Sequence, residues 1–230
     1  MTTRFLLAAA ACALALGGMQ AACADEIMLR GPVGEGYNMR VTSLKEARFK
    51  TTVRQKYDFS CGSAAVATLL TYQYGYPMNE ETVFYNMFTG GDQDKIRREG
   101  FSLLDMKRFL EKAGFQADGY ELPLSKLEET QLPAIVLIVE NGYHHFVVVK
   151  GVKDGRVLLG DPARGTRAIS REHFEKVWDG SLLFVIHNRT DQAKFNLAGD
   201  WRVAPLGPYW MGVDRDSLFF KVMPPHAINF

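Results

Sequence analysis

The stretch QKYDFSCGSAAVATLLTYQ, Gln55–Gln73, decides the fold. From Cys61 onward it is apolar on nearly every face through Leu70, which is typical of a buried central helix. Cys61 therefore begins such a helix, where unpaired backbone N–H groups and the helix dipole favour negative charge on a sulfur atom. The position suits a thiolate nucleophile, but taken alone it suits a buried, inert cysteine equally well.

The N-terminus predicts a secretory signal peptide over residues 1–24. One charge, Arg4, precedes the apolar run Phe5–Leu16, and the small-residue segment ends in Ala22-Cys23-Ala24. The apolar run is too short for an ordinary membrane span. Cleavage after Ala24 predicts a periplasmic or secreted protein. A lipoprotein acylated at Cys23 is the alternative, and it is disfavoured because Gln20 stands where such signals usually carry an aliphatic residue.

Cleavage would remove Cys12 and Cys23 and leave Cys61 as the only cysteine. A single thiol in an exported chain has no intramolecular disulfide partner, so nucleophilic catalysis becomes the leading explanation. The full chain has 27 Lys and Arg against 26 Asp and Glu, and loss of Arg4 leaves 26 of each. This neutral balance argues against nucleic acid as a partner. We see no metal-ligand spacing and expect no cofactor.

The rest of the chain is helical first and then rich in strands. Asn79 and Ser102 are predicted to cap two helices that end near Gly90-Gly91 and Gly114. Short Val-, Ile- and Leu-rich runs follow and predict an antiparallel meander, with a short capped helix at 170–178. The predicted strands are 134–140, 146–152, 156–160 and 182–187. The fold class is therefore α+β, with a domain over residues 25–189 and a C-terminal extension of unknown role over 190–230.

Two of these strands carry a candidate base and its partner, His145 and Asp161. A nucleophile needs a base, and the base needs a group that holds it in the useful tautomer. A three-residue loop, Lys153–Gly155, would pair Val147 with Asp161 and place His145 on the same face. A two-residue loop would instead turn His145 to the opposite face. The catalytic interpretation therefore predicts the three-residue loop, with Gly155 left-handed.

Each of these residues also has an ordinary structural explanation. Asp161 precedes Pro162, and Asp-Pro often starts a turn. His144 must point to the face opposite His145, so only one of them can face the thiol. Gln55 lies six residues before Cys61, where its amide could donate to an oxyanion together with the Cys61 backbone N–H. Alone, that spacing means little.

Taken together, the motifs resemble a known family. Gln55–Gly62, the HFVV run that begins at His145, and Asp161-Pro162 are similar to motifs of papain-like cysteine peptidases that process bacteriocin precursors. Those enzymes cut after a double-glycine leader. The resemblance implies a papain-like fold, with N-terminal helices packed on an antiparallel β-sheet. It makes Cys61 the nucleophile, His145 the general base, Asp161 its orienter and Gln55 the oxyanion donor.

The chain departs from family members that are fused to export ATPases, because it has its own predicted signal peptide and shows no ATPase module. It is more similar to stand-alone exported members, some of them linked to secretion of functional amyloid. The resemblance implies a peptide or protein substrate and, as partners, components of an export or amyloid system. Three alternatives stay open: a peptidase-like binding module without turnover, a papain-like cell-wall amidase or transglutaminase-type enzyme, and an accessory factor of an export system.

Overall fold

The computed structural model describes residues 26–30, 36–40 and 42–205. The predicted signal peptide, residues 1–24, lies outside the described residues, as do residues 206–230 of the predicted extension. The chain divides into two units, residues 1–43 and 44–230. In the first, β1 (Glu26–Arg30) pairs antiparallel with β2 (Gly36–Arg40).

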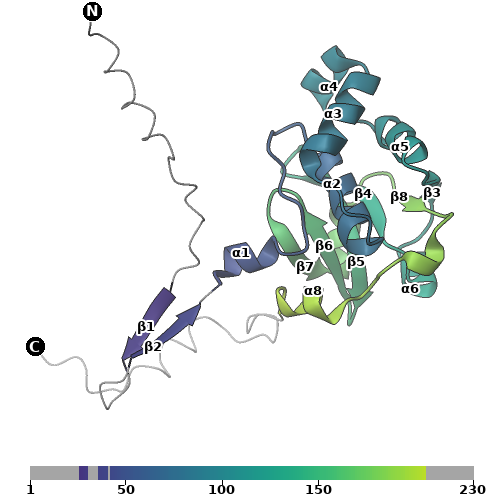
Figure 1. Cartoon of the computed structure of the whole chain (residues 1–230). Coiled ribbons are helices and arrows are strands. Elements are labelled where there is room, and N and C mark those ends of the chain that lie inside the picture. Colours follow the sequence, from purple (N-terminus) through teal and green to yellow (C-terminus); the bar gives the residue numbers. More distant parts are fainter. Residues whose placement is uncertain (1–25, 31–35, 41, 206–230) are drawn as a thin grey trace, which may run out of the picture. The chain divides into compact units, whose positions relative to one another are not determined.

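The second unit is an α+β domain (Figure 1). Its helices are α1 (Leu44–Arg48), α2 (Cys61–Thr68) with a π-helical continuation (Leu69–Gln73), α3 (Glu80–Gly90), α4 (Gln93–Glu99), α5 (Leu103–Lys112), α6 (Ser125–Thr130), α7 (Arg171–Val177), a 3₁₀ turn (Thr190–Gln192) and α8 (Ala198–Arg202). Its strands are β3 (Ala117–Glu121), β4 (Ala134–Glu140), β5 (Tyr143–Lys153), β6 (Arg156–Asp161), β7 (Gly165–Ser170) and β8 (Leu182–Ile186).

The predicted helix at Cys61 is confirmed, and every residue of α2 is buried. The predicted caps are confirmed as well. The Asn79 side chain accepts from the backbone N–H of Thr82, and Ser102 forms a reciprocal capping box with Asp105. These polar signals mark the helix starts because each satisfies a backbone donor that the helix cannot satisfy itself.

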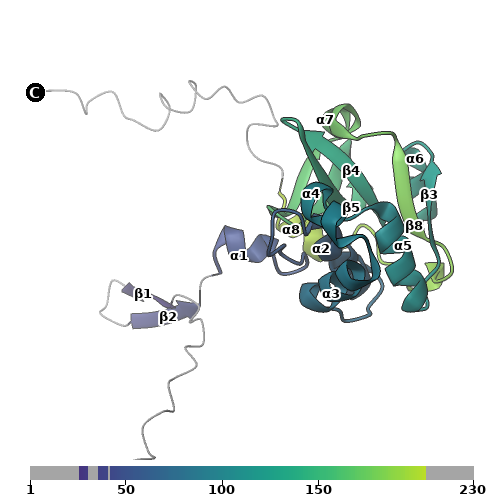
Figure 2. The same cartoon turned by 90° about the horizontal axis from the view of Figure 1, so that it is seen from above.

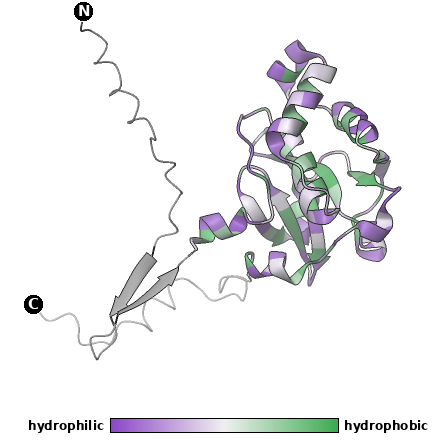
Figure 3. Ribbon diagram, in the orientation of Figure 1, coloured by the Kyte–Doolittle hydropathy of each residue, from purple (hydrophilic) through white to green (hydrophobic). Residues whose placement is uncertain are grey.

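The six strands form one antiparallel sheet in the order β3-β8-β4-β5-β6-β7. The meander through β4, β5 and β6 is as predicted, whereas β8 returns to pair between β3 and β4. Strands β3 and β7 and helices α4 and α6 are not among the elements predicted from the sequence. Apolar residues fill both sides of the sheet: one core is shared with α2, α3 and α5, and the other with α6 and α7. Figure 2 shows the sheet from above, and Figure 3 shows that hydrophobic residues concentrate in α2 and the strands.

The turn between β5 and β6 corrects one prediction. Lys153 pairs with Arg156, so the loop has two residues, Asp154 and Gly155, rather than three. Both have positive φ, 51° and 67°, as a tight hairpin turn that matches strand twist requires. The left-handed Gly155 is confirmed, and the predicted three-residue loop is wrong. The register near the site nevertheless agrees with prediction, because β5 contains a bulge between Val149 and Gly151.

Within the described residues, no helix is both long and apolar enough to cross a membrane.

Candidate active site

Cys61 is the first residue of α2 and is almost enclosed, with 7% of its surface exposed. Ser60 precedes it, but the Ser60 hydroxyl donates to the carbonyl of Tyr57 at 3.0 Å and does not cap the helix. The side chain of Ser60 therefore leaves the first-turn N–H groups of α2 open. Such groups, with the helix dipole, stabilise negative charge on the sulfur or on an oxyanion beside it.

His145 and Asp161 meet as the catalytic interpretation requires. Nε2 of His145 lies 2.8 Å from Oδ1 of Asp161. This bond leaves Nδ1, which is buried and has no close hydrogen bond to a described residue, for the Cys61 side. Burial of the ring opposes its charging. The hydrogen bond to Asp161 and the interaction with the Cys61 side chain outweigh that effect and raise the pKa of His145 to about 9.

Asp161 is fixed by more than His145. Its Oδ1 accepts from the backbone N–H groups of Ala163 at 2.9 Å and Arg164 at 3.1 Å, and its Oδ2 accepts from Nε of Arg167 at 2.9 Å. Burial opposes ionisation of the carboxyl, yet the hydrogen bond to His145 and the Arg167 charge lower its pKa to about 2. Asp161 thus starts a turn, as Asp-Pro often does, and also orients the histidine.

A second carboxylate, Glu140 at the end of β4, extends this network. Its Oε1 accepts from Nη2 of Arg167 at 3.0 Å, and its Oε2 accepts from Nη1 of Arg164 at 2.6 Å. Neither Arg167 nor Glu140 is among the site residues predicted from the sequence. Arg167 lies on β7, a strand without an apolar alternation, so no sequence pattern placed it beside Asp161.

Gln55 lies on the loop that leads into α2. Its backbone N–H donates to the carbonyl of Pro162 at 3.1 Å, which ties this loop to the turn after Asp161. Its Nε2 donates to the carbonyl of Tyr57 at 3.2 Å, and the amide also interacts with the hydroxyl of Tyr143. The structure therefore places Gln55 on the loop that ends at Cys61, the first residue of α2, and the role of Gln55 as oxyanion donor stays a prediction.

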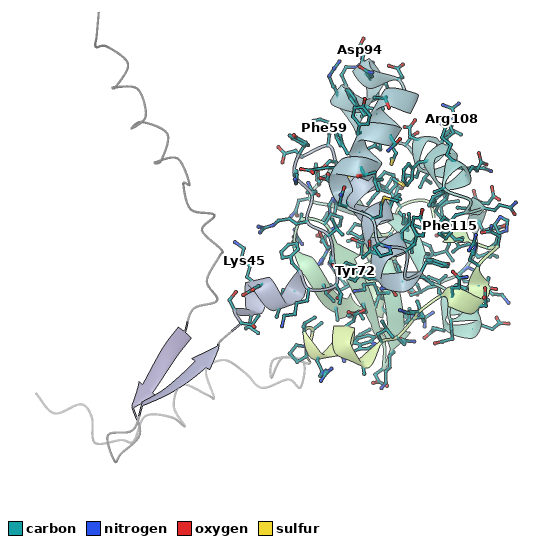
Figure 4. All side chains as sticks on the ribbon, in the orientation of Figure 1. Lys45, Phe59, Tyr72, Asp94, Arg108 and Phe115 are labelled. Carbon is teal, nitrogen blue, oxygen red and sulfur yellow. The ribbon has the colours of Figure 1, made fainter. Side chains whose placement is uncertain are left out.

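A cleft of about 510 Å³ opens over Cys61. It runs between the loop before α2, the α4–α5 connection and the β4–β5 hairpin. Its lining residues are Asp58, Phe59, Cys61, Arg97, Arg98, Glu99, Gly100, Phe101, Leu137, Tyr143, His144 and Phe146. Figure 4 labels Phe59 on that loop. The adjacent histidines are thus divided as predicted: His144 lines the cleft, and His145 pairs with Asp161.

A cysteine at the start of a buried helix, with a His–Asp pair on the neighbouring strands, defines a papain-like cysteine peptidase site. The chain belongs to the Peptidase C39 family, whose model matches residues 50–190. It is therefore a cysteine-type peptidase, as the resemblance implied.

The relatives agree with this placement. Over 153 residues the chain is 42% identical to "Probable functional amyloid protease FapD" of Pseudomonas aeruginosa. The alignment covers 66% of this chain and 68% of that protein. It is 41% identical over 162 residues to the protein of the same name from Pseudomonas fluorescens, covering 70% and 72%. The peptidase domain of Streptococcus ComA, a bi-functional ABC transporter, matches with a TM-score of 0.50 at 21% identity. That match covers 59% of this chain and 96% of the domain and supports the predicted fold.

Proposed function

We propose that this chain is an exported cysteine endopeptidase that cleaves a peptide or protein at a Gly-Gly-type site and supports an export or functional-amyloid system. The observation that carries the proposal is Cys61 in the lining of the cleft, in contact with the buried His145–Asp161 pair. The relatives named as functional amyloid proteases support the amyloid part, and the predicted signal peptide supports a periplasmic location.

The proposed reaction is acyl transfer. The Cys61 sulfur attacks the scissile carbonyl carbon, and the resulting oxyanion takes hydrogen bonds from the Cys61 backbone N–H and the Gln55 amide. Protonated Nδ1 of His145 gives its proton to the leaving amine, which breaks the C–N bond. Neutral His145 then takes a proton from water, whose oxygen attacks the thioester and releases the acid product. Asp161 holds Nε2 through both steps.

The recessed position of Cys61 supports a glycine-type site. Only 7% of Cys61 is exposed, and Phe59 and Tyr143 line the same cleft. A backbone without side chains on the residues preceding the scissile bond can reach farther into such a cleft than one that carries a Cβ.

Substrate and location are tested separately. Purified protein without residues 1–24 is incubated with a peptide containing Gly-Gly, with a matched Ala-Ala peptide and with peptidoglycan fragments. Cleavage after Gly-Gly, abolished in folded Cys61→Ala, supports the proposal. Cleavage by the Cys61→Ala variant at the wild-type rate overturns the assignment of the nucleophile. Cutting of peptidoglycan alone indicates the amidase alternative, and thiol-dependent binding without product indicates a binding module. Cell fractionation of the full chain tests the periplasmic location.

A further inference from the structure

The bulge in β5 determines which face His145 occupies. If β5 had no bulge, the two-residue turn would pair Val148 with Asp161, and His145 would lie on the face opposite Asp161. In the structure Val149 pairs with Leu159, but the next pair is Gly151 with Leu158, so Lys150 is an extra residue. Val148 consequently pairs with Gly160, and His145 returns to the face of Asp161. The bulge at Lys150 is therefore a condition for the His145–Asp161 contact.

The extra residue is held by its own side chain. Lys150 is fully buried, with 0% exposed. Its Nζ donates to the carbonyl and the hydroxyl of Thr51, each at 2.9 Å, and lies 2.9 Å from Oδ2 of Asp200. A buried ammonium group is costly unless it is paired and hydrogen-bonded, so these contacts fix where the Lys150 side chain can lie. The backbone is held too, since the carbonyl of Lys150 accepts from the N–H of Asn196 at 2.9 Å.

Asp200 reaches Lys150 from the far end of the described chain. It belongs to α8 and is 2% exposed, and its Oδ1 accepts from the Thr51 hydroxyl. We call residues 193–204 the C-terminal strap. The strap begins against the helix after α2, where the N–H of Lys194 donates to the carbonyl of Gln73 at 2.8 Å. It ends where Arg156, at the start of β6, donates to the carbonyl of Ala204 at 3.3 Å.

The buried cluster of Lys150, Thr51 and Asp200 contacts two segments that carry active-site residues. A Cβ on Gly160, the residue before Asp161, would lie 3.0 Å from Cδ of Lys150 and 3.3 Å from Oγ1 of Thr52. Glycine at this position therefore lets the lysine stem pack against the β6 backbone. Thr51 and Thr52 lead into the loop that carries Gln55, and Thr52 bonds to Thr166 of β7 at 2.8 Å. Figure 4 labels Tyr72, whose ring centroid lies 6.0 Å from Nζ of Lys150.

We propose that Lys150 and Asp200 are positioning residues of the active site, and that their ion pair holds the bulge that places His145 on the face of Asp161. The C-terminal strap is then part of the catalytic unit. This inference rests on the proposed function only for its activity readout.

The test separates positioning from stability. Lys150→Met alone leaves the Asp200 carboxylate buried without its cation, and we expect that variant to lose thermal stability. The double variant Lys150→Met/Asp200→Leu replaces the ion pair by apolar groups and should regain most of that stability. Its kcat should stay about 100-fold below wild type, because a misplacement of about 1 Å costs that much. KM should change little.

A second readout does not depend on catalysis. The ring resonances of His145 are titrated by NMR in the full domain with its strap. In wild type, His145 should titrate with a midpoint near pH 9. In the double variant, the midpoint should move toward the ordinary histidine pKa of 6.5, because the contact with Asp161 is lost. A folded double variant with wild-type kcat and wild-type His145 titration overturns the proposal. Leu110→Ala, a substitution in the core under α5, is the control: it should lower stability without moving the His145 titration.

Asp200→Asn covers the case in which the double variant fails to fold. It preserves side-chain size and the Thr51 bonds of Lys150 but removes the opposite charge. A folded Asp200→Asn protein should show reduced kcat and a lowered His145 titration midpoint, and no change in either overturns the proposal. If wild type cuts no peptide while His145 titrates near 9 and the double variant titrates lower, the proposed function fails and the positioning role stands.

Discussion

Nε2 of His145 lies 2.8 Å from Oδ1 of Asp161, and the two side chains are 7% and 1% exposed. Water therefore screens this contact little, so the carboxylate acts strongly on the imidazole. The same contact fixes Nε2 as the nitrogen that faces Asp161 and directs Nδ1 toward Cys61. In the proposed reaction, Nε2 therefore serves to orient the ring and Nδ1 transfers the proton.

Asp161→Asn should lower kcat/KM by about 100-fold or more, the scale of general acid–base catalysis. It should also shift the pH profile. The pKa of His145 is raised to about 9, so the protonated imidazole persists up to that pH in wild type, and kcat/KM should fall above it. We call this fall the alkaline limb of the pH profile. Loss of the carboxylate moves the midpoint of the alkaline limb toward pH 6.5. The pH dependence of kcat/KM in the free enzyme measures it, and an unmoved limb would contradict the assignment.

The matched control is Asp118→Asn. Asp118 of β3 also pairs with a histidine, His187, at 3.0 Å, but these two side chains are 40% and 38% exposed. Its loss should leave the activity profile unchanged.

The His145–Asp161 pair also predicts a pH window for stability. The pKa of His145 is higher in the folded state than its ordinary value of 6.5. This difference stabilises the folded state fully below about pH 6.5, and the contribution is lost as the pH rises through about 9. A lowered carboxyl pKa stabilises fully above about 3.8 and loses its contribution as pH falls through about 2. The difference in Tm between wild type and Asp161→Asn should therefore be largest between about pH 4 and 6.5 and should narrow on both sides. A difference that is constant from pH 3 to 10 would refute this coupling.

Arg167→Met should shift the alkaline limb the opposite way from Asp161→Asn. Removing the guanidinium leaves the Asp161 carboxylate less neutralised, so it holds the His145 proton more strongly and the limb moves above pH 9. The activity should still fall, by about 10- to 150-fold, because a hydrogen bond to a charged group contributes about 1.5–3 kcal/mol. Arg164→Met is the control, since the Arg164 guanidinium bonds to Glu140 and not to Asp161. A downward shift in Arg167→Met would refute this account.

Local signals in the sequence were sufficient for the parts of the fold that local chemistry determines. Asn79 and Ser102 predict the starts of helices, because each side chain accepts a hydrogen bond from a backbone N–H of the first turn. Asn141-Gly142 announces its hairpin because both residues adopt positive φ, and Glu140 pairs with Tyr143 as a two-residue turn requires. The apolar run from Cys61 predicts a buried helix, because it leaves no polar face for water.

The parts that depend on distant contacts were not predictable in this way. The bulge in β5 is held by Asp200, fifty residues along the chain, and no local pattern at Lys150 announces it. The face of His145 was therefore predicted correctly from a wrong turn length, because the two-residue turn and the bulge offset each other. Arg167 was missed for a related reason: β7, with the sequence GTRAIS, is a strand only because β6 pairs with it.

Gly62→Ala should displace Cys61 without removing any catalytic group. A Cβ at Gly62 would lie 2.9 Å from Cβ of Phe101 and 2.8 Å from Cε of Met106. Met106 can adjust, but the Phe101 Cβ is attached to its backbone, so the start of α2 must move. A displacement near 1 Å lowers kcat by about 100-fold. Gly90→Ala meets only the flexible end of Lys112 at 3.5 Å and is the control. Wild-type kcat in a folded Gly62→Ala protein would contradict this argument.

Tyr143→Phe should weaken the wall of the cleft. The Tyr143 hydroxyl donates to the carbonyl of Asp58 at 2.7 Å, and this bond ties the β4–β5 hairpin to the loop that carries Gln55. The ring centroid also lies 5.9 Å from that of His145, and phenylalanine keeps this contact. Tyr143→Phe also removes the interaction of this hydroxyl with the Gln55 amide. Loss of the Asp58 bond alone, about 1 kcal/mol, should reduce kcat/KM about 5-fold, and loss of the Gln55 contact adds to this reduction. Since the alkaline limb is set by Asp161 and not by this bond, it should stay near pH 9. Kinetics across pH 6–10 measure both quantities, and a shifted limb would show that the hydroxyl acts on His145 rather than on the loop.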